Sequence, residues 1–205
     1  MTATGGSSLA NLRRLVPTRL DQETCDLCSE PIPEPHRHLY DPAKRELVCA
    51  CKACSLLFSS REAAKYRLVP QTVRFLQDFQ IDDVLWEELS LPVNMAFMHY
   101  STPAQRVVAY YPSPAGATES LLALDSWQEL VSQNPALGKL EPDVEALLVN
   151  RIGLDESEAE YFIAPIDECY RLVGIVRAGW RGLSGGTEVW KEIKAFFEGL
   201  KSRAG

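Results

Sequence analysis

The sequence lacks several features that would point to a membrane, nucleic-acid or histidine-based catalytic function. None of its apolar stretches approaches the roughly 18 to 20 residues that span a bilayer. Lys and Arg (21) are outnumbered by Asp and Glu (28), which gives a net charge of −7. Most nucleic-acid-binding proteins show the opposite imbalance. Only three histidines are present, and no serine stands in a recognisable nucleophile motif.

The first twenty residues, MTATGGSSLANLRRLVPTRL, also lack the pattern of an export signal. They contain the pair Arg13-Arg14, but no long apolar segment follows it. We therefore expect residues 1–20 to form a flexible lead-in and the protein to be cytoplasmic. In a chain that is not exported, clustered cysteines are more often metal ligands than disulfide partners.

Cysteines are concentrated in one short stretch, CDLCSEPIPEPHRHLYDPAKRELVCACKAC, which holds five of the six. A C-x2-C pair stands at each end, and 22 residues separate the two pairs. Two thiolates from one tight turn bind a metal ion from one side, and a second pair completes a tetrahedron from the other side. The spacing therefore predicts a metal site with the ligands Cys25, Cys28, Cys51 and Cys54.

Zinc is the metal predicted for this site, with iron as the alternative. Four thiolates suit either a structural zinc ion or a rubredoxin-type iron ion. Rubredoxin-like sites usually carry a glycine directly after each cysteine pair, where this chain has Ser29 and Ser55. The two serines favour zinc and a structural, redox-inactive role.

Other possible ligands lie close to the two pairs. On a strand, Cys49 and Cys51 would point to the same face, so Cys49 could replace Cys51 or lie beside the site as a spare thiol. His36 and His38 are within reach along the chain, and we expect them to lie beside the site or on the surface rather than bind the metal. Cys169 is far along the chain, and we expect it to be a buried core thiol.

The residues between the cysteine pairs predict a β-hairpin. HRHLYD and ELVCA are short β-type runs around the turn PAKR, and SLLFSSREAAKY after the second pair favours a helix. A knuckle, a hairpin and a cysteine pair at a helix start form the order of a treble clef, in which helix N–H groups stabilise thiolates. A zinc ribbon is the alternative. We assign residues 21–66 to this metal-binding module.

The remaining residues, 67–205, predict an α+β domain with a short, mostly antiparallel sheet and several helices. Strands are expected in the aromatic and β-branched runs at 94–100, 106–111 and 161–164. Helices are expected at 81–89, at 125–133, at 142–153, after a cap at Asp167, and at 187–203. The last helix carries an apolar stripe that faces either the core or a partner.

No residue stands in a pattern that predicts catalysis. His99 lies inside the apolar run NMAFMHY, where a histidine is more often structural than catalytic. Ser184, Gly185 and Gly186 precede a helix, where free N–H groups can bind an anion. They match neither a dinucleotide-binding motif nor a P-loop, so we expect a simple turn there. The sequence gives no positive case for an enzyme.

Four stretches together resemble a bacterial family of unknown function: CDLCSEPIPEPHRHLYD with LVCACKACSLLF, YYPSPAGATES, PDVEALLVNR, and PIDECYRLVGIVRAGWRGLSGG. The resemblance runs from about residue 17 to residue 200 and includes the cysteines at 25, 28, 49, 51 and 54. Members of that family are encoded beside uptake NiFe hydrogenases.

The resemblance implies a role alongside a hydrogenase. We expect a non-catalytic accessory protein (an assembly factor, adaptor or accessory subunit) with a structural zinc site. Its partners would be NiFe hydrogenase subunits or maturation proteins. A rubredoxin-like iron electron-transfer protein that serves the hydrogenase is the alternative. A zinc-module regulator that binds nucleic acid is a third hypothesis, against which the acidic composition counts.

Overall fold

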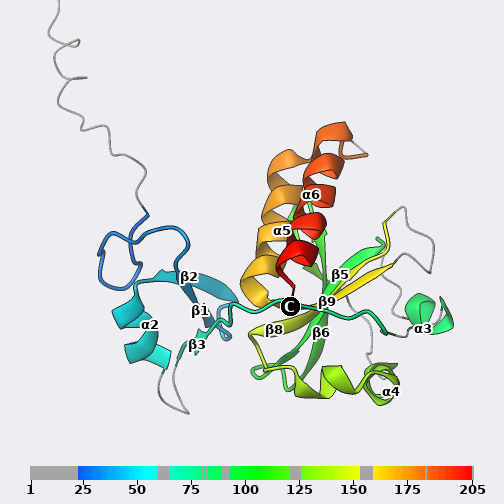
Figure 1. Cartoon of the computed structure of the whole chain (residues 1–205), viewed down its shortest axis with the longest axis horizontal. Coiled ribbons are helices and arrows are strands. Elements are labelled where there is room, and N and C mark those ends of the chain that lie inside the picture. Colours follow the sequence, from blue (N-terminus) through cyan, green and yellow to red (C-terminus); the bar gives the residue numbers. More distant parts are fainter. Residues whose placement is uncertain are drawn as a thin grey trace, which may run out of the picture.

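The structure, a computed structural model, has the α+β architecture expected from the sequence, with a small unit beside a larger one (Figure 1). The predicted lead-in over residues 1–20 lies outside the described residues. The structure describes residues 23–59, 65–79, 81, 83–88, 93–120, 126–152, 159–182 and 184–204.

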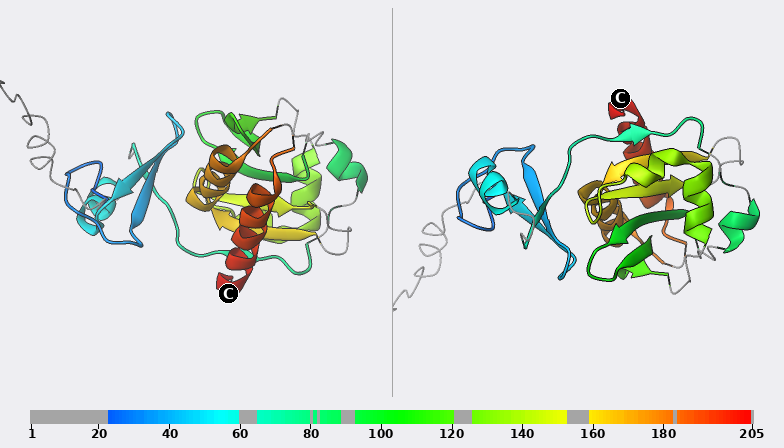
Figure 2. Two further views of the ribbon diagram at one scale, coloured as in Figure 1. Left: turned by 90° about the horizontal axis from the view of Figure 1, so that it is seen from above. Right: turned by 90° about the horizontal axis from the view of Figure 1, so that it is seen from below.

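The small unit is a three-stranded antiparallel sheet with one helix, and its strand order is β2-β1-β3. Its elements are β1 (Arg37–Asp41), β2 (Glu46–Ala50), α2 (Lys52–Ser59) and β3 (Arg67–Leu68). The predicted hairpin is confirmed as β1 and β2. Its turn closes because the backbone N–H of Arg45 donates to the carbonyl of Asp41 at 2.7 Å. Beyond β3 the chain runs in an extended segment to the larger unit (Figure 2).

The larger unit is built on a six-stranded sheet in the order β4-β9-β8-β5-β6-β7. All of its neighbouring strands are antiparallel. The strands are β4 (Arg74–Phe75), β5 (Met95–Ser101), β6 (Arg106–Ser113), β7 (Gly116–Glu119), β8 (Glu145–Asn150) and β9 (Glu160–Pro165). The strands predicted at 94–100, 106–111 and 161–164 are therefore confirmed as β5, β6 and β9.

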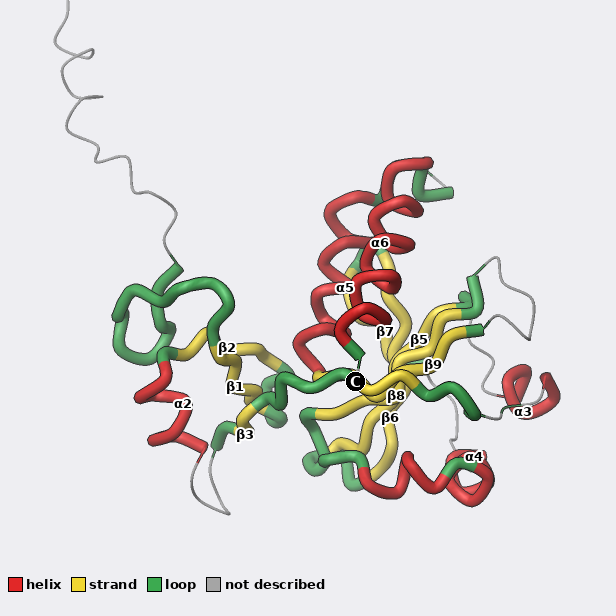
Figure 3. The backbone as a smooth tube through the Cα atoms, in the orientation of Figure 1, coloured by secondary structure: helices red, strands yellow, loops and turns green. Residues whose placement is uncertain are grey.

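Each face of the larger sheet is covered by helices (Figure 3). The helices are α3 (Asp83–Glu88), α4 (Ser126–Gln133), the 3-10 helix η1 (Pro135–Lys139), α5 (Ile166–Gly179) and α6 (Thr187–Arg203). Ala146 and Leu148 of β8 belong to the hydrophobic core under α5 and α6, whereas Leu147 and Val149 belong to the core with α3, α4 and η1. The strand's two-residue period thus divides its side chains between two cores.

Residues 142–153, predicted to form a helix, instead contain the internal strand β8. The run ALLV is apolar at every position, and such a run fits a strand buried on both faces as well as a buried helix. In addition, Asp143 has a φ angle of 68°, outside the helical region. Its carboxylate accepts hydrogen bonds from the backbone N–H of Thr102 (2.8 Å) and from the Thr102 hydroxyl (2.7 Å), which fixes the start of the strand.

Helix α6 matches the segment predicted at 187–203, and its apolar stripe faces the core rather than solvent. The buried residues of the stripe are Val189, Ile193, Phe196, Phe197 and Leu200. Trp190 is the member of the predicted stripe that remains 37% exposed. The lysines and glutamates of the helix lie on the opposite, solvated side, as amphipathic spacing requires.

The buried, internal position of β8 can be tested by replacing leucine with alanine at a buried site in this strand and at an exposed site elsewhere. Leu147→Ala should lower the free energy of unfolding by about 2–5 kcal/mol, because Leu147 is fully buried and truncation leaves a cavity. Leu56→Ala in α2 is the matched control, since Leu56 is 59% exposed and should change stability by less than about 0.5 kcal/mol. Urea denaturation of both variants provides the measurement. Equal effects would contradict the assignment of β8.

Candidate metal centre

The structure brings four thiols together at one end of the small unit. The sulfur atoms of Cys25, Cys28, Cys51 and Cys54 all lie within 4.8 Å of one another. The Sγ atoms of Cys28 and Cys51 are 3.8 Å apart. A tetrahedral zinc ion with Zn–S bonds of about 2.3 Å separates its sulfurs by about 3.8 Å, whereas a disulfide bond measures about 2.0 Å. The four thiols are therefore spaced for one tetrahedral ion.

The first cysteine pair is held in a tight knuckle. The backbone N–H of Cys25 donates to the carbonyl of Glu30 at 2.8 Å, and the N–H of Ser29 donates to the carbonyl of Cys25 at 2.7 Å. Ser29 has a φ of 62°, the left-handed conformation that glycine adopts without strain. The knuckle thus forms with a serine at the position where rubredoxin-like sites usually carry glycine.

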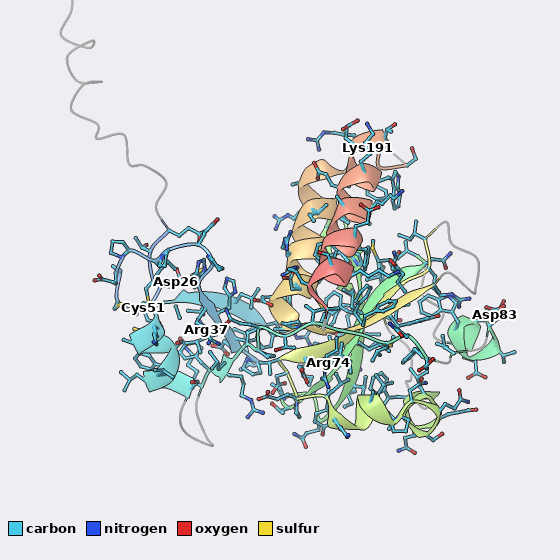
Figure 4. The ribbon with its side chains drawn as sticks, viewed as in Figure 1. Asp26, Arg37, Cys51, Arg74, Asp83 and Lys191 are labelled. Atoms are coloured by element: carbon cyan, nitrogen blue, oxygen red, sulfur yellow. The ribbon has the colours of Figure 1, made fainter. Side chains whose placement is uncertain are left out.

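The second cysteine pair stands at the start of a helix. Cys51 directly precedes α2, and the backbone N–H of Cys54 donates to the Cys51 sulfur at 3.4 Å. A thiolate is stabilised at a helix N-terminus by free N–H groups and by the helix dipole. Figure 4 places Cys51 at this helix start, away from the larger unit. Knuckle, hairpin and helix therefore follow in the predicted treble-clef order, although the helix begins earlier than predicted.

The thiols of Cys25 and Cys54 differ in how readily they lose a proton. Burial raises the pKa of the Cys25 thiol, but backbone N–H groups of Cys51, Leu27 and Cys28 donate to its sulfur and bring the pKa down to about 6. Burial, together with the neighbouring thiols, raises the pKa of Cys54 to about 12. Four thiolates this close repel one another strongly without a cation. A bound cation would remove that repulsion, so the donor set fits a divalent metal.

Cys49 does not belong to the four-thiol group. Strand β2 ends at Ala50, so Cys51 has left the strand and the two cysteines do not share a face as the strand-based prediction assumed. Cys49 instead lies opposite His38 in the β1–β2 register. Its sulfur and one ring nitrogen each of His36 and His38 lie within 4.8 Å of one another. The cluster is a second group of potential ligands, which sequence spacing did not reveal.

Asp26 ties the first knuckle to β2. Its carboxylate accepts the backbone N–H of Cys49 at 2.7 Å, and its own N–H donates to the Cys49 carbonyl at 2.9 Å. A residue between the two cysteines of the first pair therefore fixes the distance from the knuckle to the strand that leads to the second pair. This double contact positions the two halves of the four-thiol site.

The small unit contacts the larger one through β1. His38 Nδ1 lies 2.8 Å from a carboxylate oxygen of Asp167, and the hydroxyls of Tyr40 and Tyr170 are 3.5 Å apart. The hydrogen bond to Asp167 raises the pKa of His38. The prediction that Asp167 caps a helix is wrong: Pro165 occupies the N-cap position of α5, and Asp167 lies within the first turn. One carboxylate oxygen of Asp167 accepts the backbone N–H of Glu168 in that turn at 2.8 Å, and the other contacts His38 across the junction.

The other residues singled out from the sequence lie apart from the four thiols. Cys169 is fully buried in α5, as expected. In the Ser184 to Gly186 turn, the Arg181 N–H donates to the Gly185 carbonyl at 3.0 Å. A Cβ atom on Gly185 would lie 3.0 Å from Val189, so glycine there permits close packing. His99 is buried in β5, with its ring stacked 5.8 Å from that of Tyr110.

Comparison with known proteins identifies a family. A family model described as a family of unknown function (DUF5947) matches residues 24–204. No curated protein and no solved structure matches the chain. Within the part of the chain that the structure describes, no helix has the length and apolar character needed to cross a membrane. The resemblance to an uncharacterised family is confirmed, and the association with a hydrogenase stays a prediction.

The burial of His99 predicts that the stability of the protein depends on pH. Burial lowers the pKa of His99 from an ordinary value near 6.5 to about 4, so the unfolded chain binds a proton in this range that the folded chain does not. Stability should therefore fall as pH falls from about 6.5 to about 4, by up to roughly 3 kcal/mol. Urea denaturation at several pH values measures this slope.

The matched control is His99→Gln, which removes the titrating group and keeps every other ionisable group. The difference in unfolding free energy between the wild type and the variant should change across this pH window and stay constant below it. A difference that is independent of pH would show that His99 titrates normally in the folded protein.

Proposed function

The chain belongs to the DUF5947 family, and we propose that it is a non-catalytic accessory protein built around a structural zinc ion. The ligands are Cys25, Cys28, Cys51 and Cys54. The observation that carries the proposal is the spacing of their four sulfur atoms, all within 4.8 Å of one another, which matches a tetrahedral ion. Zinc bound there would cross-link the knuckle to α2 and would contribute stability rather than reactivity.

The composition of the site supports a structural role. Four thiolates fill every position of a tetrahedral zinc ion and leave none for water or substrate, as in structural zinc sites generally. The small unit also has little apolar material of its own. Its buried apolar cluster consists of Cys25, Ile32, Leu39, Ala50 and Cys54, so two of five members are cysteines. A unit with so small a core usually requires a metal or disulfide cross-link.

The proposed partner is a NiFe hydrogenase or one of its maturation proteins. Support comes from the sequence stretches that resemble a family encoded beside such hydrogenases. A protein that holds or bridges a partner needs a rigid scaffold and exposed apolar side chains. Leu56 and Phe58 on α2 are 59% and 42% exposed, and they offer such a surface beside the zinc site.

Metal analysis tests the zinc centre. Protein purified anaerobically from its own host should carry one zinc ion at the four-thiol centre and be colourless. Cys54→Ser should lose this ion and unfold the small unit, because structural zinc contributes roughly 10 kcal/mol or more at neutral pH. Cys169→Ser is the control, since Cys169 lies in α5 and should leave the zinc content unchanged. Mass spectrometry of the metal content and a UV–visible spectrum report both results.

Two outcomes would contradict the zinc centre. Iron with thiolate charge-transfer bands would make the same four cysteines a rubredoxin-like redox centre. Equal zinc content in the wild type and in Cys54→Ser would show that the ligand set is wrong.

A pull-down from the native host tests the partner. The tagged protein should recover hydrogenase subunits or maturation proteins, and a strain that lacks the protein should show reduced hydrogenase activity. The double variant Leu56→Asp, Phe58→Asp should recover less partner, because charge on an apolar contact surface opposes docking. Val84→Asp is the matched control, since Val84 is 69% exposed on the distant helix α3. No recovered subunit, together with normal activity in the deletion strain, would refute the association.

A further inference from the structure

We propose that His36, His38 and Cys49 form a second metal site, separate from the four-thiol centre, that binds a late first-row divalent ion such as Zn²⁺. One ring nitrogen of each histidine and the Cys49 sulfur lie within 4.8 Å of one another. This separation is compatible with three donors on one ion at bond lengths of about 2.0 to 2.3 Å. The site lies at the junction of the small and larger units, next to α5.

Strand pairing creates this cluster. His38 and Cys49 are directly opposite one another in the antiparallel pair of β1 and β2, so their side chains project from the same face of the sheet. His36 immediately precedes β1, and its ring centroid lies 4.7 Å from that of His38 at an angle of 65°. The hairpin therefore holds all three donors on a rigid element, which is the arrangement that a metal site requires.

The largely buried ring of His36 is the observation that points to a bound metal ion. Its side chain is only 9% exposed, yet neither of its ring nitrogens has a hydrogen-bond partner among the described residues. Glu23 places a carboxylate oxygen 3.2 Å from Nδ1, but without hydrogen-bond geometry. Leaving a buried polar group without a partner costs about 1–3 kcal/mol. A metal ion bound to one ring nitrogen of His36 would give that nitrogen a partner.

His38 is oriented as metal-binding histidines commonly are. Its Nδ1 lies 2.8 Å from a carboxylate oxygen of Asp167, which leaves Nε2 available for an ion. A carboxylate that accepts the other ring N–H fixes the tautomer and ring orientation of a ligating histidine and increases its basicity. Asp167 belongs to α5 of the larger unit, so both units contribute to the site.

The donor set selects the class of ion. One thiolate and two imidazoles favour zinc, cobalt, nickel or copper over magnesium and calcium, which prefer oxygen ligands. Three protein donors leave one tetrahedral position open, in contrast to the closed four-thiol set. Both histidines also line a surface cavity of about 680 Å³, together with Asp167 and Arg171. An ion at this site can therefore exchange with solvent.

Calorimetric titration of the full-length protein with Zn²⁺ tests the site. Dialysis in metal-free buffer should leave the ion at the four-thiol centre, and the wild type should then bind one further Zn²⁺ per chain. Asp167→Asn should weaken this second binding by roughly 10- to 100-fold, since it changes the orienting carboxylate and no ligand. Cys49→Ser and His36→Gln should weaken it by more than Asp167→Asn does. Cys169→Ala, which removes a thiol elsewhere in the chain, should leave it unchanged.

Cobalt provides a readout that a change in folding would not imitate. Co²⁺ added to protein that retains zinc at the four-thiol centre should produce a thiolate-to-cobalt charge-transfer band in the wild type and in His36→Gln at high Co²⁺, but not in Cys49→Ser. Retention of the first ion and of the circular dichroism spectrum shows that each variant is folded. The proposal is overturned if the wild type binds no second ion. It is equally overturned if Cys49→Ser and His36→Gln both bind that ion as tightly as the wild type.

Discussion

The β1–β2 hairpin contributes side chains to two hydrophobic cores, and the arrangement of both units depends on this shared hairpin. Successive side chains of a strand point to opposite faces. Leu39 therefore enters the small core with Cys25 and Cys54, whereas Tyr40 enters the core under α5 and α6. Both side chains are almost completely buried. Because burying a side chain of this size contributes about 2 kcal/mol, the two units cannot separate without a substantial loss of stability.

The end of strand β2, and not alternation along it, keeps the two cysteine groups distinct. Cys49 lies opposite His38, whose ring contacts Asp167 of the larger unit, whereas Cys51 lies beyond the end of the strand, where the chain turns into α2. Two residues of separation thus place these thiols in different chemical environments. The four-thiol group lies beside the small core of its own unit, and the group around Cys49 lies where the two units meet.

Features that depend on residue spacing along the chain were predictable from the sequence. Features that depend on which distant segments pair with one another were not. The C-x2-C spacing predicted the four-thiol group, and the apolar stripe predicted α6 to its final residue. The run at β8 was misassigned because a strand buried on both faces has no alternation to detect. The role of Asp167 was also missed, since its partner His38 lies 129 residues away and only the docking of β1 on α5 brings them together. The H-x-H spacing of His36 and His38 was a weak indication of a metal site. The third donor became apparent only from the strand register, which places Cys49 opposite His38.

The two clusters differ in what they allow a metal to do. A four-thiolate site is chemically closed, so an ion bound there holds the chain together and does not exchange readily. A site with two imidazoles and one thiolate is open at one position, and both of its histidines line a cavity. It also depends on a carboxylate from the other unit, so occupancy and the docking of the two units are thermodynamically linked. A metal-dependent change in how the two units dock would therefore arise at the junction, whereas an ion bound by the four thiols would hold the hairpin to α2.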